Sequence, residues 1–119
     1  MILKNRDRAM TEIPTEEAAI LAIDLDGTVC TINSDYSQCE PLPGSLDALK
    51  TLQARGFSIY LHTGRHINNA RVTQAWLDRF EGPHDLVVFG KPPARIYLDD
   101  RGMRFTNWDD VLEQLPRRP

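Results

Sequence analysis

Four aspartates and one lysine have the types and spacing of a site that handles phosphate. Asp24 and Asp26 follow an apolar run, Asp99 and Asp100 follow another, and Lys91 comes shortly before the second run. Four carboxylates brought together repel one another unless a cation neutralises them. Magnesium prefers oxygen ligands and is commonly held by a few carboxylates together with a substrate phosphate. These residues therefore predict a Mg²⁺ site that binds a phosphate ester.

Three further groups are predicted to bind the phosphoryl group itself. Lys91 supplies a point charge for a phosphoryl oxygen, and Thr63 supplies a hydroxyl. The backbone N–H of Gly64 is expected at the N-terminus of a helix, which is a favoured position for an anion.

The acidic pair after the first run has the chemistry for catalysis. Once metal and lysine neutralise a phosphate, the Asp24 carboxylate can attack phosphorus and form an aspartyl-phosphate. Asp26 can protonate the leaving oxygen and then activate the water of the second step. Gly27 permits a tight departure from the preceding strand.

Positioning these residues requires strands that end at one edge of a sheet. The apolar patterns predict strands and amphipathic helices in alternation, with breakers such as Gly56 and Gly82-Pro83 between them. The expected strands are 19–25, 57–61, 85–90 and 96–98, with a short edge strand at 103–105. One helix is expected to begin near 44 or 45. A second carries apolar residues from 67 to 80. A third runs from a cap at Thr106 or Asn107 to 115.

This alternation indicates an α/β fold, a three-layer, doubly wound, Rossmann-like parallel sheet with helices on both faces. Ligands in such sheets lie beyond the carboxyl ends of the strands, where the acidic residues are expected. The predicted organisation is one catalytic domain over 19–115, an N-terminal arm over 1–18 expected to be partly disordered, and a flap over 29–42.

Composition excludes several classes of protein. The 119 residues are 41% hydrophobic and 26% charged, as in an ordinary globular domain, and the net charge of −3 does not favour nucleic acid as a partner. The longest early apolar run is too short for a membrane span or a signal peptide. Cys30 and Cys39 are expected to be reduced thiols in the cytoplasm, although a bridge between them stays open.

The acidic and phosphate-binding residues, taken in order, resemble the four motifs of the haloacid dehalogenase superfamily, phosphatase branch. The resemblance covers about 19 to 112 and rests on Asp24-Leu25-Asp26-Gly27-Thr28, Thr63, Lys91 and Asp99-Asp100. It implies that Asp24 is both nucleophile and metal ligand, that Asp26 is the general acid/base and lends its backbone carbonyl to the metal, that Thr63 and Lys91 bind the phosphoryl group, and that Asp99 and Asp100 hold magnesium.

The chain is short for this superfamily and has room for a minimal cap at most. In capless relatives a neighbouring subunit covers the site or the site stays open to large substrates, so a homo-oligomer is one expectation. The expected substrate is a small phosphate ester, with a sugar phosphate as a weak suggestion.

Alternative interpretations stay open at this point. A receiver-like phospho-aspartate signalling module uses similar residues, although its acidic pair comes first in the chain and its lysine last. An inactive regulatory protein that kept the fold is another alternative. Arg65 is equally consistent with a substrate contact and with a solvated surface position.

Overall fold

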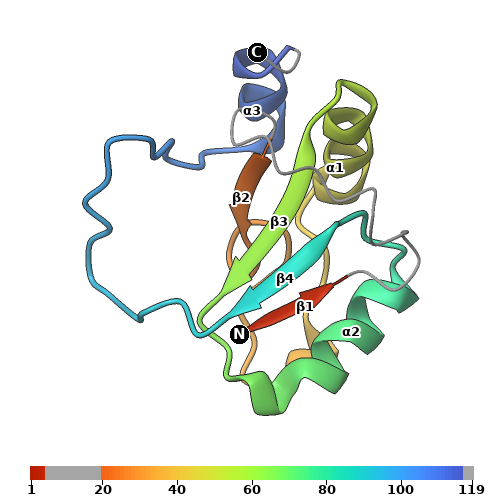
Figure 1. The fold of residues 1–119 in the computed structure, drawn as a ribbon. Coiled ribbons are helices and arrows are strands. Elements are labelled where there is room, and N and C mark those ends of the chain that lie inside the picture. Colours follow the sequence, from red (N-terminus) through yellow and green to blue (C-terminus); the bar gives the residue numbers. More distant parts are fainter. Residues whose placement is uncertain (5–19, 117–119) are drawn as a thin grey trace.

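The computed structural model describes residues 1–4 and 20–116. They form a four-stranded sheet in the order β1-β4-β3-β2 (Figure 1). The strands are β1 (Ile2–Lys4), β2 (Ile20–Asp24), β3 (Ser58–Thr63) and β4 (Leu86–Phe89). The helices are α1 (Ser45–Ala54), α2 (Ala70–Arg79) and α3 (Trp108–Gln114), with 3₁₀ turns η3 (Tyr36–Gln38) and η4 (Ile67–Asn69).

Strands β2, β3 and β4 confirm the predicted parallel core. β2 pairs in parallel with β3, and β3 pairs in parallel with β4. In this register Asp24 lies opposite His62, at the carboxyl end of the sheet. The predicted α/β alternation thus places the end of β2 next to the end of β3.

The N-terminal strand departs from the prediction. Ile2–Lys4 pairs antiparallel with β4, so the sheet is mixed rather than wholly parallel. Three residues carry no readable periodicity, which is why this strand was not predicted. The rest of the predicted arm, residues 5–18, lies outside the described residues.

Helices α1 and α2 lie on one face of the sheet, because two successive right-handed crossovers that move in the same direction must do so. Ile59 and Leu61 point toward them and are fully buried. On the opposite face Tyr60 and Val88 are only half-buried. In the described part of the chain, helices therefore do not cover both faces in the three-layer manner expected.

The predicted strands at 96–98 and 103–105 are wrong. Residues 90–107 instead form a long extended loop that leaves the end of β4 and returns at α3 (Figure 1). Gly90 has a positive φ of 84°, and Pro92 and Pro93 follow it. Prolines have no N–H to give to a sheet ladder, so the chain turns away here instead of pairing.

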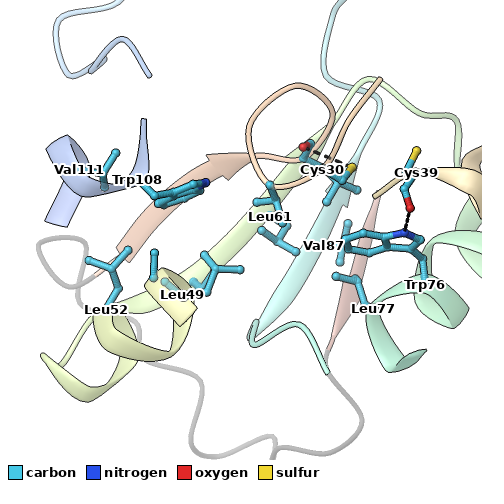
Figure 2. Close-up of a cluster of buried hydrophobic side chains, with 14 of the residues drawn as sticks. Cys30, Cys39, Leu49, Leu52, Leu61, Trp76, Leu77, Val87, Trp108 and Val111 are labelled. Carbon is cyan, nitrogen blue, oxygen red and sulfur yellow. Dashed lines mark hydrogen bonds between the residues drawn. The ribbon is translucent and has the colours of Figure 1, made fainter. Parts of the chain in front are cut away.

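One hydrophobic cluster joins the sheet to all three helices (Figure 2). Leu49 and Leu52 come from α1, Leu77 from α2, and Trp108 and Val111 from α3. As predicted, Asn107 caps α3, where its side chain accepts a hydrogen bond from the N–H of Asp110. The N-cap of α1 is Gly44, within the predicted start at 44 or 45.

No helix within residues 1–4 and 20–116 combines the length and the apolar character that crossing a membrane requires.

Two leucines test the described core with the same chemical change. Leu49 is fully buried, and Leu98, in the long loop, is 98% exposed. We expect Leu49→Ala to lower the free energy of unfolding by about 2–5 kcal/mol, because it leaves a cavity. Leu98→Ala should change it by less than about 0.5 kcal/mol in metal-free protein. Urea denaturation followed by circular dichroism measures both, and equal losses would contradict the described burial.

Candidate active site

The backbone after β2 folds back on itself directly behind Asp24. The carbonyl of Leu25 accepts hydrogen bonds from the N–H groups of Val29 and Cys30, at 2.9 and 3.1 Å. Gly27 has a φ of 85° within this turn, a conformation that side chains with a Cβ rarely adopt. The turn therefore fixes the backbone from which the Asp26 side chain projects.

Asp24 and Lys91 meet at the carboxyl end of the sheet. The Lys91 ammonium lies 3.7 Å from Oδ1 of Asp24, whose side chain is 37% exposed. Two backbone bonds position the lysine, from its N–H to the carbonyl of Thr63 at 2.9 Å and from Gly90 N–H to the carbonyl of Arg65 at 3.1 Å. The structure thus brings together two residues that lie 67 positions apart in the chain.

Asp26 forms a two-pronged ion pair with Arg65. Nη2 of Arg65 donates to Oδ1 of Asp26 at 2.7 Å, and Nε donates to Oδ2 at 3.1 Å. Arg65 is only 3% exposed, so the interpretation as a solvated surface residue is wrong. The sequence signal that could have indicated this is its position immediately after a buried strand, facing the acidic motif.

Thr63 is fully buried beneath this pair. Its hydroxyl donates to Oδ2 of Asp26 at 3.3 Å and accepts the N–H of Arg65 at 3.1 Å. The Thr63 hydroxyl, which we expected to bind phosphate, is therefore bonded to Asp26 and Arg65 instead. Thr63 nevertheless lies beside the acidic motif, as expected.

Gly64 lies between Thr63 and Arg65, but it does not begin a helix. The α-helix starts only at Ala70, after the η4 turn, so the expected helix N-terminus at Gly64 is wrong. A Cβ at Gly64 would lie 3.4 Å from the carbonyl oxygen of Lys91, at the short end of ordinary van der Waals contact, so the two loops pass close to each other here.

The electrostatics of the site follow from these contacts. Burial disfavours the charged guanidinium, but hydrogen bonds to Asp26 and its negative charge outweigh burial, so the pKa of Arg65 is raised. Burial lowers the pKa of His62, and Lys91 lowers it further, while Asp24 acts in the opposite direction. His62 is therefore neutral at pH 7, a site neighbour that sequence reasoning missed.

Asp26, Cys30 and Cys39 form a compact group whose ligand atoms all lie within 4.8 Å of one another. Both cysteines are free thiols and buried. Burial first, and then the charge of Asp26, raise the pKa of the Cys30 thiol, which opposes formation of a metal-binding thiolate. Nη2 of Arg65 already lies 3.6 Å from Cys39 Sγ and 4.0 Å from Cys30 Sγ, so a guanidinium provides the positive charge here.

Asp99 and Asp100 are both exposed in the 90–107 loop. Oδ1 of Asp99 accepts the N–H of Arg101 at 2.8 Å, as in a local turn. The structure thus brings together Asp24, Asp26, Thr63, Gly64 and Lys91, whereas among the described contacts neither Asp99 nor Asp100 joins them.

The segment predicted as a flap also contributes to the site. Within 29–42, the ring of Tyr36 in η3 lies 4.0 Å from the Arg65 guanidinium carbon. The carbonyl of Cys39 accepts the indole N–H of Trp76 from α2 at 2.7 Å (Figure 2). These contacts hold the segment against α2.

Comparison with known proteins agrees with this geometry. The model of the haloacid dehalogenase-like hydrolase family matches residues 21–78. This range contains Asp24, Asp26, Thr63 and Arg65, and it ends before Lys91. No curated protein sequence matches the chain.

Solved structures have the same fold. A structural genomics target from Vibrio cholerae is 26% identical, with a TM-score of 0.63 over 79% of this chain and 94% of that chain. Two structures of the Pnkp1/Rnl/Hen1 complex, one described as an RNA repair complex, are 20% identical, with TM-scores of 0.54 and 0.53. They cover 83% of this chain and 35% and 32% of theirs, and at this identity they show the fold alone.

The family match begins in β2 and ends in α2, so it spans the strand that presents the acidic pair and the strand that presents Thr63. Together with the parallel β2-β3-β4 core and the Vibrio cholerae structure, this match supports membership of the chain in the haloacid dehalogenase-like superfamily.

Proposed function

We propose that this protein is a magnesium-dependent phosphomonoester hydrolase that acts on a small phosphorylated substrate through a phosphorylated Asp24. The observation that carries the proposal is the half-exposed Asp24 carboxylate with the Lys91 ammonium 3.7 Å away. A phosphate ester placed between them would pair a phosphoryl oxygen with Lys91 while phosphorus faces a carboxylate oxygen. The match to a hydrolase family supports the same reaction class.

The reaction has two balanced steps. The first step starts with Asp26 protonated: an oxygen of Asp24 attacks phosphorus, the bond from phosphorus to the ester oxygen breaks, and Asp26 gives its proton to the departing alcohol and becomes the carboxylate that pairs with Arg65. In the second, Asp26 takes a proton from water, the water oxygen attacks phosphorus, and the bond to Asp24 breaks. The products are the alcohol and inorganic phosphate, and both aspartates return to their starting state.

The donor atoms at this end of the sheet suit magnesium in kind. Asp24 offers a partly exposed carboxylate, and Asp26 offers a backbone carbonyl, so the donors are hard oxygens. Bound there, the ion would neutralise phosphoryl charge and make phosphorus easier to attack. Asp99 and Asp100 belong to the proposed set of magnesium ligands, but in the described structure neither contacts the other residues of that set.

The open edge of β2 offers a way for those two residues to reach the site. In the described part of the chain, no strand pairs with the outer side of β2. Ile96 and Leu98, just before the acidic pair, are 74% and 98% exposed. A shift of the 90–107 loop toward this edge would cover these side chains and carry Asp99 and Asp100 toward Asp24.

The nucleophile is tested by Asp24→Asn. An amide is a poor nucleophile, so we expect magnesium-dependent phosphate release from an aryl phosphate to fall by at least about a thousandfold. Asp47→Asn, the same change at an exposed position of α1, serves as the control and should keep the wild-type rate. Full turnover in Asp24→Asn would exclude the mechanism.

Metal binding is tested by the acidic pair of the loop. Chelator should stop phosphate release, and added Mg²⁺ should restore it. In Asp99→Asn and Asp100→Asn, we expect the Mg²⁺ concentration for half-maximal rate to rise at least about tenfold, because an amide oxygen carries no charge for the ion. Asp109→Asn, an exposed change in α3, is the matched control. Unchanged magnesium dependence in both loop variants would exclude Asp99 and Asp100 as magnesium ligands.

A further inference from the structure

Arg65 is a buried charged residue that the reaction proposed above does not use. Its side chain is 2% exposed, and its main partner is the carboxylate of Asp26, which is 25% exposed. Two of its nitrogens bind the two oxygens of that carboxylate, at 2.7 and 3.1 Å. This two-pronged geometry fixes the plane of the carboxylate, which a single hydrogen bond does not do.

The guanidinium is itself fixed by three residues from two other parts of the fold. Nη1 donates to the hydroxyl of Thr73 in α2 at 3.0 Å. Nη2 lies 3.6 Å from the sulfur of Cys39, and the ring of Tyr36 stacks against the guanidinium at 4.0 Å. Helix α2 and the 29–42 segment therefore decide where Arg65 points, and Arg65 decides where Asp26 points.

Stability alone is a weak explanation for this arrangement. Removing two charges from water costs free energy that their attraction often only offsets, and apolar residues of similar volume often serve a fold equally well. These contacts of Arg65 instead give one carboxylate a single orientation. That carboxylate is the proposed proton donor and acceptor, whose efficiency depends on its placement.

We propose that Arg65 is a positioning residue that holds the ionised Asp26 in the orientation in which it takes a proton from water in the second step; this inference rests on the proposed function. Arg65 is almost wholly buried, while a quarter of the Asp26 side chain stays exposed. Without Arg65, Asp26 would keep the 3.3 Å contact with the Thr63 hydroxyl and the 3.8 Å contact with the Cys30 thiol, and it would rotate more freely. Proton transfer would slow, while substrate binding at Asp24 and Lys91 would persist.

The test compares Arg65→Met with Arg65→Lys in the full chain, using an aryl phosphate and saturating Mg²⁺. We expect Arg65→Met to lower kcat by about 10²-fold or more, in the range of lost acid–base catalysis, with KM within about threefold of wild type. Arg65→Lys should recover at least about tenfold of that loss, because an ammonium can still bind one oxygen of Asp26.

A double variant separates positioning from general damage. Residues that act as one unit are not additive, so Asp26→Asn/Arg65→Met should be no slower than Asp26→Asn alone. Arg55→Met is the matched control: Arg55 is also partly buried and donates to the carbonyls of Leu112 and Leu115, away from the site. It should lower thermal stability and leave kcat unchanged.

Arg65→Met risks failing to fold, so circular dichroism must first show a native spectrum. If it does not fold, Thr73→Val, which removes the Nη1 partner of Arg65, carries the test and should lower kcat without raising KM. If the variant folds and the wild-type protein is active, an unchanged kcat or parallel changes in kcat and KM would overturn this inference. The proposed function would then still stand. A wild-type protein that releases no phosphate from any ester would overturn the proposed function and this inference together.

Discussion

The parallel pairing of β2 with β3 is the constraint on which the rest of the site depends. Its register places Asp24 opposite His62, so the acidic turn after β2 and the Thr63–Arg65 turn after β3 leave the sheet side by side. Backbone bonds from Gly90 and Lys91 to the second turn then bring the lysine to Asp24. A slip of one residue in this register would exchange the faces of all these side chains.

Much of this arrangement could be predicted from the sequence because it depends on local patterns. Asp24 and Asp26, separated by one residue, follow the apolar run of β2, and Thr63 ends the run of β3. Each pattern fits a buried parallel strand that ends at a polar edge of the sheet. Asn107 fits a helix cap because its side chain can bond to the N–H three residues on. These features need only short-range physical chemistry, and the structure bears them out.

Other features depend on long-range partners and could not be read in this way. Ile2–Lys4 becomes a strand only because β4 offers an edge, and 96–98, an equally apolar run, finds no partner among the described residues. Arg65 lies between Gly64 and His66, neither of which indicates burial, and it is still buried, since Asp26, 39 positions earlier, compensates its charge. Sequence patterns report the preference of a segment, whereas its partners decide what it forms.

The indole of Trp108 connects the two ends of the described core. Its N–H donates to the carbonyl of Thr28 at 2.9 Å, across 80 positions of sequence. Closing so long a loop costs chain entropy. Contacts between such distant residues slow folding, because the entropy is lost before the contact stabilises the chain. The turn that carries Asp26 thus gains this backbone partner only when α3 docks. Loss of that docking would leave the Thr28 carbonyl without the indole, so the C-terminal helix supports a turn that lies 80 positions earlier in the chain.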